Sequence, residues 1–239
     1  MRAVILAAGE GQRLRPLTDD LPKPMLRIAG KPILEHNIRL LTSSGIEEIA
    51  VNTHHRPEAI SEYFGDGAAF GVRMTYSHEV ELHGTAGALL PLCEFLSSTF
   101  LVLYGDNLTT CDLPALFRFH HSKGGVASLA VYRREGATAG GIVAIGEGDR
   151  IERFLEKPGE DQIFSSWVNA GIMVCEPSIL ERIPSGFSDF GKDVIPKMIS
   201  DGAAIFAYRM ADPQERLWWI DSPEDYERTK ADVHEWDLH

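Results

Sequence analysis

Positive charge is scarce in this chain of 239 residues, which has 23 lysines and arginines against 35 aspartates and glutamates. The formal net charge of −12 disfavours a surface that binds nucleic acid or an anionic membrane. We therefore expect neither of these partners. The deficit still leaves room for one local basic pocket, which a phosphorylated small molecule would need.

Cysteines and long apolar runs are also few. The three cysteines, Cys93, Cys111 and Cys175, are far apart and lack metal-ligand spacing, which is typical of free thiols in a reducing compartment. The apolar segment at residues 3–8 is too short for a signal-peptide core, and no segment reaches the length of a membrane span. The expected location is the cytoplasm.

Short apolar runs alternate with amphipathic segments along the first half of the chain. The patterns predict strands over residues 2–7, 47–53, 72–77, 100–104 and 126–132, and helices over 31–45, 56–67, 86–96 and 113–122. This alternation predicts an α/β fold with a Rossmann-like, mostly parallel twisted sheet and helices on both faces. Residues 140–145 and 150–157 flank a glycine turn and predict a hairpin. No Pro/Gly/Ser-rich linker is visible, so we expect a single domain over residues 1–239.

Ligands of open α/β sheets bind at the carboxyl ends of the strands. Three groups of residues lie at the carboxyl ends of predicted strands in this chain: the loop from Gly9 to Arg15, Asp106, and the stretch from Asn52 to His55. The pattern alone therefore predicts a binding site at this edge of the sheet.

The segment LAAGEGQRLRPLT places Gly9 and Gly11 directly after a strand. It lacks the third glycine of a dinucleotide fingerprint, and it lacks the Walker A pattern. Glycines in this place can simply form a tight turn. Arg13, Arg15 and Lys23 favour a phosphate ligand, because three cations within eleven residues are unusual in an acidic chain.

The same segment, followed by PKPM at residues 22–25, resembles the signature of the sugar-1-phosphate nucleotidyltransferases, L-x-G-G-x-G-x-R-L-x-P-L-T-x(n)-P-K-P. Further matches follow in the family's order: GTAGAL at 84–89, GD at 105–106, FLEKP at 154–158, VNAGIMV at 168–174 and WWIDSPEDY at 218–226. Together they span nearly the whole chain. The GTAGAL motif is closer to short bacterial mannose-1-phosphate or heptose-1-phosphate guanylyltransferases than to the thymidylyl enzymes.

The resemblance implies an enzyme that joins a nucleoside triphosphate to a sugar 1-phosphate, giving an NDP-sugar and pyrophosphate by in-line attack on the α-phosphorus. It also implies Mg²⁺ as cofactor, GTP as the nucleotide, and mannose or heptose as the sugar. UTP-, CTP- or dTTP-dependent relatives, a phosphocholine cytidylyltransferase and a non-catalytic nucleotide-sugar sensor are the alternatives. A homodimer is left open.

By resemblance, Arg13 contacts the triphosphate and Lys23 lies near the reacting phosphates, and these two are the predicted catalytic residues. Lys23 stands between two prolines in a loop, where we expect it to be exposed. Asp106 and Asp221 are the implied pair that holds Mg²⁺, an all-oxygen site suited to that ion. Ser222 is predicted to cap a helix directly after Asp221.

The remaining contacts also follow from the resemblance. The predicted nucleotide-binding residues are Leu6, Ala8, Gly9, Gly11, Glu81, Gly84 and Thr85. Among them, Glu81 would accept hydrogen bonds from the N1–H and N2–H₂ groups of guanine. The predicted sugar-phosphate-binding residues are Gly141, Glu156, Lys157 and Asn169. Arg15 is expected to brace the glycine loop from outside, while Gly140 and Ser222 depart from the residues that the family usually has there.

Overall fold

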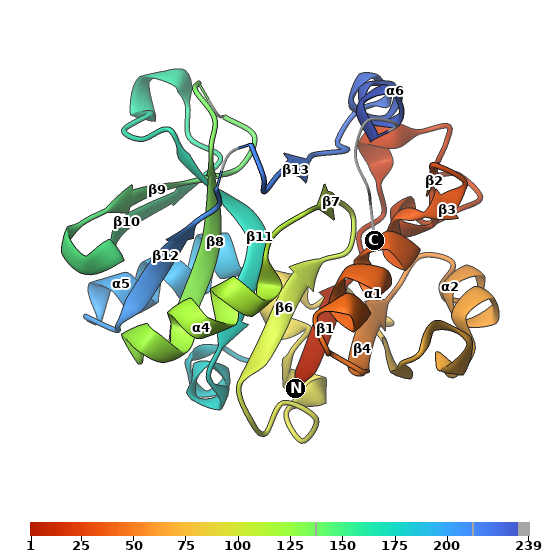
Figure 1. The fold of residues 1–239 in the computed structure, drawn as a ribbon, viewed down its shortest axis with the longest axis horizontal. Coiled ribbons are helices and arrows are strands. Elements are labelled where there is room, and N and C mark those ends of the chain that lie inside the picture. Colours follow the sequence, from red (N-terminus) through yellow and green to blue (C-terminus); the bar gives the residue numbers. More distant parts are fainter. Residues whose placement is uncertain (137, 212, 234–239) are drawn as a thin grey trace. The chain divides into compact units, whose positions relative to one another are not determined.

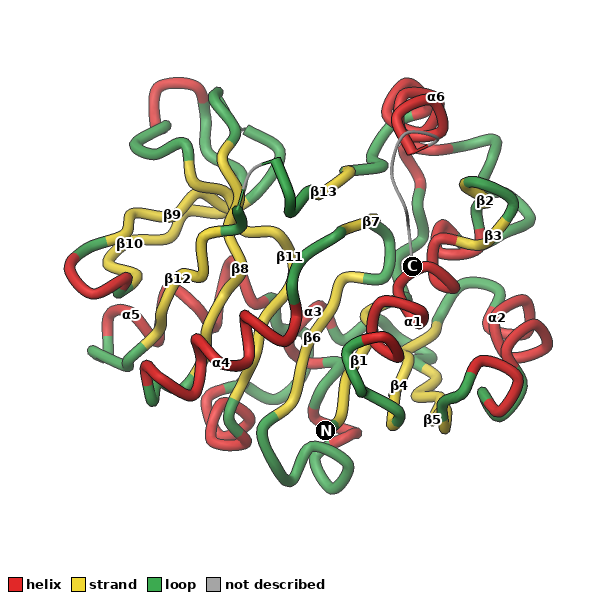
Figure 2. Tube along the Cα trace, viewed as in Figure 1, coloured by secondary structure: helices red, strands yellow, loops and turns green. Residues whose placement is uncertain are grey.

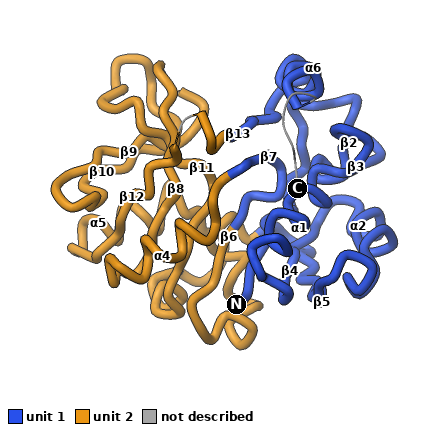
Figure 3. The backbone as a smooth tube through the Cα atoms, in the orientation of Figure 1, with its two compact units in different colours: residues 1–82, 103–110, 217–239 blue, residues 83–102, 111–216 orange. Residues whose placement is uncertain are grey.

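The structure is a computed structural model and describes residues 1–136, 138–211 and 213–233. The chain forms two compact units (Figure 3): unit 1 comprises residues 1–82, 103–110 and 217–239, and unit 2 comprises residues 83–102 and 111–216. The chain passes between the units four times, so neither is one continuous segment. The single domain expected over residues 1–239 stays a prediction.

Unit 1 is built on parallel strands. Its elements are β1 (Arg2–Leu6), η1 (Gln12–Leu14), η2 (Lys23–Met25), β2 (Arg27–Ile28), β3 (Lys31–Pro32), α1 (Ile33–Ser43), β4 (Glu48–Thr53), α2 (Pro57–Phe64), η3 (Ala68–Phe70), β5 (Arg73–His78), β7 (Leu108–Thr109), β13 (Leu217–Trp218) and α6 (Pro223–Asp232). Strands β1, β4 and β5 pair in that order (Figures 1 and 2), with α1 and α2 in the crossovers that parallel pairing needs. The predicted α/β alternation is confirmed here.

A buried apolar cluster joins three distant parts of unit 1. It comprises Leu14, Leu26, Ile28, Ile33, Leu108, Trp218, Ile220 and Val233. Burying each large side chain contributes roughly 1.5–3 kcal/mol, so the cluster holds the glycine loop, β7 and the segment before α6 together. Leu14 follows Arg13, Ile220 precedes Asp221, and Leu108 lies two residues after Asp106. The core of unit 1 thereby brings the predicted catalytic and metal-binding residues to one place.

Unit 2 is mixed rather than parallel in its pairing. Its elements are α3 (Gly84–Gly87), η4 (Leu90–Leu92), α4 (Leu113–Lys123), β8 (Ala127–Arg133), β9 (Gly141–Ile145), η5 (Glu147–Asp149), β10 (Ile151–Glu156), η6 (Glu160–Gln162), β11 (Trp167–Cys175), η7 (Pro177–Arg182), η8 (Phe190–Val194), α5 (Ile195–Ser200) and β12 (Ile205–Arg209). Strand β6 (Phe100–Tyr104) runs from unit 2 into unit 1. β9 and β10 form the predicted hairpin; β11 is antiparallel to β9 and to β8, and β12 is parallel to β8.

The helix predicted over residues 86–96 is wrong. The segment forms the four-residue α3 and then the 3₁₀ turn η4. Pro91 cannot donate a backbone hydrogen bond, and a glycine in a helix interior weakens the helix, so the segment does not continue as one helix. At Gly87 a Cβ would lie 2.7 Å from the Gly186 carbonyl oxygen, which shows why the close packing of this short helix needs glycine. Within the described residues, no helix has the length and apolar character that a membrane crossing demands.

Candidate active site

Lys23 lies between Asp106 and Asp221, the two aspartates predicted to hold Mg²⁺. Its Nζ atom is 2.8 Å from Asp106 Oδ2 and 3.1 Å from Asp221 Oδ1. The expectation of an exposed Lys23 is wrong, because the residue is only 5% exposed. The neighbouring Pro24 and Met25 are buried as well, so the first residue of η2 is drawn into unit 1 with them.

Charge keeps this buried lysine protonated. Burial disfavours the ammonium and by itself lowers the pKa of Lys23. The carboxylates of Asp106 and Asp221 and their hydrogen bonds outweigh burial, so the pKa is raised above its ordinary value of 10.5. At neutral pH Lys23 is therefore a cation held between two anions.

The glycine loop adds a second cation to the cluster. Arg13 in η1 lies with its guanidinium 3.2 Å from Asp221 Oδ1, and its side chain is 64% exposed. Arg15 pairs instead with Asp19 at 3.5 Å, within the same loop. Arg13 is thus an accessible cation beside the buried one, as binding a polyanion requires.

Gly9 and Gly11 have different reasons to be glycine. Gly11 has φ +63°, and a Cβ there would come 3.1 Å from the Cβ of Lys23. The Thr18 hydroxyl fixes the turn by donating to the Gly11 carbonyl at 2.8 Å. A Cβ at Gly9 would meet nothing within 4 Å, and its φ is not left-handed. The fold therefore requires glycine at position 11 but not at position 9, where the open space suits a ligand.

Short backbone elements fix the two aspartates. Asp106 follows β6 and Gly105, whose N–H donates to the Leu6 carbonyl at 2.8 Å. Ser222 caps α6 as predicted, because its hydroxyl accepts a hydrogen bond from the Asp225 N–H at 3.1 Å. Asp221 directly precedes this cap, so its backbone is held at the start of α6.

The two aspartates suit a divalent cation that also binds phosphates. One ammonium reaches Asp106 and Asp221 together, so both carboxylates face the same point. In the part of the chain that the structure describes, no group of three or more His, Cys, Asp or Glu residues is placed to hold a metal. A pair of carboxylates is sufficient for Mg²⁺ where substrate phosphates and water supply the other oxygens. The donor set therefore fits the ion.

Glu156 is the central predicted residue of unit 2. It ends β10 opposite Gly141 of β9. A Cβ at Gly141 would lie 2.8 Å from Glu156 Oε2 and would also collide with the Phe154 ring, while a Cβ at Gly191 would lie 2.5 Å from the same oxygen. The two glycines therefore let the backbone pack directly against this carboxylate.

The surroundings of Glu156 disfavour its charge. Burial raises the pKa of Glu156, and the Asp189 carboxylate raises it further, against the opposing effects of Lys157 and Lys192. Lys157 is exposed and has φ +48°, a conformation that costs a non-glycine residue energy. Glu156 is half-buried and Lys157 is exposed, and both stay predicted sugar-phosphate-binding residues.

Asn169 lies in β11 at an irregular part of the sheet. Its Oδ1 accepts a hydrogen bond from the Gly171 N–H at 3.2 Å, and it is only 7% exposed. The register between β11 and β8 shifts just after Asn169, where Gly171 has φ +71°. The bulge changes the direction of the strand and fixes the amide side chain.

Thr85 and Gly84 contact other residues of unit 2. The Thr85 hydroxyl lies 3.1 Å from Asp189 Oδ1 and accepts a hydrogen bond from the Phe190 N–H at 2.9 Å. A Cβ at Gly84 would meet the Ser188 carbonyl, so this position needs glycine for packing. Glu81, by contrast, is exposed in the segment after β5. Leu6 and Ala8, the other residues predicted to bind nucleotide, are buried at the end of β1.

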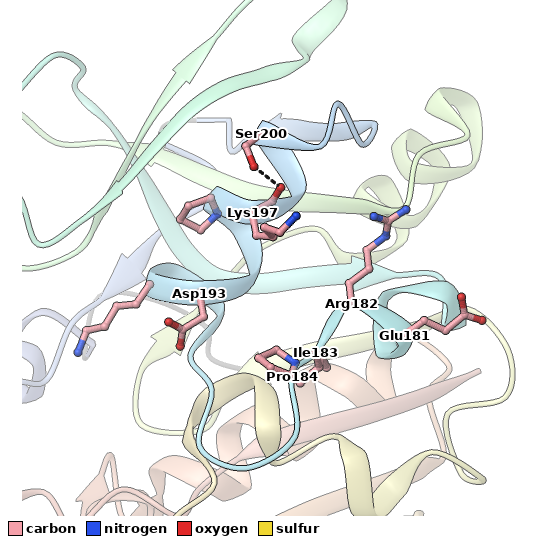
Figure 4. Close-up of a pocket in the computed structure, with 9 residues that line it drawn as sticks. Glu181, Arg182, Ile183, Pro184, Asp193, Lys197 and Ser200 are labelled. Carbon is pink, nitrogen blue, oxygen red and sulfur yellow. Dashed lines mark hydrogen bonds between the residues drawn. The ribbon is translucent and has the colours of Figure 1, made fainter.

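A groove of about 680 Å³ lies elsewhere in unit 2 (Figure 4) and contains none of the predicted site residues. Its lining residues are Glu181, Arg182, Ile183, Pro184, Lys192, Asp193, Pro196, Lys197 and Ser200. Side chains of both charges line it, and Ser200 bonds within its own helix to the Lys197 carbonyl at 2.8 Å. The chemistry predicted from the sequence therefore lies outside this groove.

Residues 2–234 match the Nucleotidyl transferase family. The chain belongs to this family. It is 37% identical over 225 residues to a UTP--glucose-1-phosphate uridylyltransferase of Synechocystis, with 88% of this chain and 58% of the relative covered. It is also 37% identical over 239 residues to a mannose-1-phosphate guanylyltransferase of Mycobacterium tuberculosis, with 97% and 64% covered. The chain thus spans less than two thirds of the length of these curated relatives.

Solved structures agree on the nucleotidyl transferase fold. HddC from Yersinia pseudotuberculosis, complexed with GMP-PN, superposes with a TM-score of 0.80 at 24% identity over 97% of this chain and 99% of that chain. A Bacillus anthracis chain in complex with sucrose gives a TM-score of 0.87 at 21% identity, covering 99% and 96%. At these identities the likeness shows the fold alone. It confirms the Rossmann-like α/β class.

The sequence does not predict that Asn52 and Glu79, two buried polar residues of this nucleotidyl transferase family member, form a pair. Asn52 lies in the stretch that the sequence marks, but its partner Glu79 is not marked. The available signal for Glu79 was a carboxylate placed directly after a strand. Asn52 donates to Glu79 Oε1 at 2.7 Å and accepts from the Ala7 N–H at 2.7 Å.

Proposed function

We propose that the protein transfers a nucleotidyl group from a nucleoside triphosphate to a sugar 1-phosphate and releases pyrophosphate. The observation that carries the proposal is the Lys23 ammonium held between Asp106 and Asp221, with Arg13 beside it. Such a cluster offers cations to phosphates and carboxylates to a divalent cation. Both relatives described above are named as enzymes of this class, a uridylyltransferase and a guanylyltransferase.

In the proposed reaction, an ionised oxygen of the sugar 1-phosphate attacks the α-phosphorus of the nucleotide. A new P–O bond forms, the bond to the oxygen that bridges to the β-phosphorus breaks, and pyrophosphate leaves with those electrons. Lys23 and Arg13 offset the negative charge that builds on the phosphates, and no enzyme nucleophile is needed. Asp106 and Asp221 would hold Mg²⁺, which when bound neutralises and orients the phosphate oxygens.

Unit 2 supplies the proposed contacts to the sugar phosphate. The half-buried Glu156 would accept hydrogen bonds from sugar hydroxyls, and the exposed Lys157 would pair with the phosphate. Asn169 would hydrogen-bond the hexose, and Gly141 would let its backbone come close to the ring. Positions 140 and 141 are both glycine, so neither position offers a side chain for a sugar contact.

GTP with mannose or heptose 1-phosphate is the proposed substrate pair, supported by the guanylyltransferase relative and by the exposed Glu81 as a guanine acceptor. UTP with glucose 1-phosphate is the second candidate, favoured by the Synechocystis relative. The scattered cysteines support the proposed cytoplasmic location. The acidic balance of the chain argues against a nucleic-acid partner.

Pyrophosphate release tests the proposal. The assay combines GTP, UTP, CTP and dTTP with the 1-phosphates of mannose, heptose and glucose, and with phosphocholine. We expect release with a sugar 1-phosphate, and its loss in Lys23→Met. Lys123→Met is the matched control, because Lys123 also pairs with an aspartate, Asp149, at 2.9 Å but lies in unit 2 on α4. No release with any pair would contradict the proposal.

A further inference from the structure

Two polar side chains are buried at the carboxyl edge of the unit 1 strands. Asn52 is 4% exposed and Glu79 is 2% exposed. Asn52 Oδ1 accepts from the Ala7 N–H at 2.7 Å, and its Nδ2 donates to Glu79 Oε1 at 2.7 Å. The three residues form one continuous hydrogen-bond relay.

The strand register explains how the relay is assembled. Asn52 of β4 lies opposite Leu6, the last residue of β1, so its side chain reaches the next backbone donor, that of Ala7. Glu79 follows β5, and its N–H continues the ladder by donating to the Thr53 carbonyl at 2.8 Å. Its own carbonyl lies 2.8 Å from His54 Nδ1. The relay therefore crosses the ends of β1, β4 and β5.

Packing alone does not account for these residue types. A buried amide and a buried carboxylate cost free energy unless their hydrogen bonds are made, and apolar side chains of similar volume often serve stability as well or better. What an apolar pair could not do is hold the Ala7 N–H at a fixed point. Ala7 lies two residues before Gly9, and Glu79 lies two residues before Glu81. The relay thus ties together two segments that the proposed function assigns to the nucleotide.

We propose that Asn52 and Glu79 are positioning residues for the nucleoside triphosphate. Their relay fixes the backbone where the glycine loop begins and the segment that leads to Glu81, and thereby sets nucleotide affinity. The inference rests on the proposed function for its kinetic readout. Its structural content, a glycine loop held by Asn52, can be measured without any activity.

A reversed hydrogen bond gives the sharpest test. In Asn52→Asp the new carboxylate is repelled by Glu79 and drawn away from the Ala7 N–H, which breaks the relay. Adding Glu79→Gln supplies an amide donor to the new carboxylate and restores the relay with its direction reversed. Glu79→Gln alone can still accept from Asn52. Glu48→Gln, at a half-buried carboxylate that pairs with Arg2 and Arg73 at the other end of β4, is the control.

We expect Asn52→Asp to raise the KM for the nucleotide about ten- to a hundredfold, the loss typical of a buried polar contact turned repulsive. The kcat and the KM for the sugar 1-phosphate should change by less than about threefold. The double variant should recover the nucleotide KM to within about threefold of wild type. A merely structural pair would lower stability without this selective change in KM.

Hydrogen exchange of the peptide that covers residues 7–14 is the second readout. Exchange should accelerate in Asn52→Asp and return to the wild-type rate in the double variant, whether or not the protein turns over any substrate. If Asn52→Asp does not fold, Asn52→Ser removes the reach of the side chain without adding charge. Unchanged exchange and unchanged nucleotide KM in the folded variants, or a double variant as impaired as the single one, would overturn the proposal. If hydrogen exchange changes as expected in the variants but the wild type releases no pyrophosphate, the proposed function is contradicted and the relay is not.

Discussion

In unit 1 the carboxylates of Asp106 and Asp221 meet an ammonium and a guanidinium, whereas in unit 2 the carboxylate of Glu156 packs against two glycines and near Asp189. The first arrangement satisfies its charges within the protein. The second leaves a half-buried acid, Glu156, whose surroundings disfavour its charged form. A ligand of unit 1 must therefore exchange partners with existing ion pairs, while a ligand of unit 2 brings partners to a group that has few.

The largest effect should come from removing a carboxylate of unit 1. Asp106→Asn and Asp221→Asn should each lower kcat by roughly a thousandfold or more, because the site for the divalent cation and the partner of Lys23 are lost together. Pyrophosphate release across a titration of Mg²⁺ measures this, and added Mg²⁺ should recover little. Asp149→Asn, which removes a paired aspartate of unit 2, is the control. Full activity of either variant at low Mg²⁺ would show that the pair does not hold the metal.

Removing the cation between those carboxylates should be the next largest change. Lys23→Met should lower kcat about 10²–10³-fold, since one charge contact to the reacting phosphates is lost. It should also strengthen Mn²⁺ binding to the nucleotide-free protein, because the ammonium no longer competes for Asp106 and Asp221. Electron paramagnetic resonance of free Mn²⁺ measures the binding, with Lys123→Met as control. Weaker Mn²⁺ binding in Lys23→Met would mean that the ammonium and the metal do not share this place.

The base contact should give an intermediate and selective effect. Glu81→Gln should lower kcat/KM for GTP about ten- to two-hundredfold, because an amide sets a donor against the N1–H or N2–H₂ of guanine. The same constants for UTP, CTP and dTTP should change little. Equal losses with all four nucleotides, or a wild type that prefers UTP, would remove the guanine assignment and leave the nucleotidyl transfer reading intact.

A smaller effect is expected in unit 2. Gly141→Ala places a methyl group against the Phe154 ring and Glu156, so the carboxylate must move. The KM for the sugar 1-phosphate should rise about tenfold, with the nucleotide KM unchanged. Gly146→Ala in the same hairpin is the control, because the three atoms nearest its methyl group all belong to the flexible side chain of Glu152. A parallel rise in both KM values would show that the change is not confined to the sugar contacts.

The smallest predicted effect is a pH dependence of stability. The pKa of Glu156 is raised above its ordinary 4.5 in the folded protein, so the folded state keeps this proton to higher pH than the unfolded chain does. The stability it contributes is full below pH 4.5 and is lost as the pH rises through the folded pKa. Glu156→Gln should therefore gain stability relative to wild type between about pH 4 and about pH 7.5. Urea unfolding at both values measures this, and a constant difference would contradict the raised pKa.

The sequence predicts the fold where periodicity and turn residues agree. The strands β1, β4 and β5, the hairpin of β9 and β10, and the cap at Ser222 are all of this kind. The helix predicted over residues 86–96 does not form, because the apolar spacing alone does not reveal the close packing at Gly87. Pro91 also lacks the backbone donor that a continuous helix needs. Local pattern specifies local structure best when no close tertiary contact competes with it.

The sequence predicts which residues make up the candidate site, but it does not predict how buried these residues are. The motifs bring Lys23, Asp106 and Asp221 into one hypothesis although they are far apart in the sequence. They say nothing of burial, because a lysine between two prolines has the local composition of an exposed loop. The Asn52–Glu79 relay is hidden for a related reason, since only the register of β1, β4 and β5 brings the two side chains together.

The open space at Gly9 determines whether a substitution there lowers the amount of folded protein in the cell. An alanine at this position meets no neighbouring atom within the protein, so the variant chain folds and passes the proteases that remove unfolded chains. Its methyl group would nevertheless enter the space in which the proposed nucleotide lies. If Gly9 contacts the nucleotide as proposed, Gly9→Ala would leave the cell with a normal amount of impaired protein, whereas Gly11→Ala would lower the amount itself.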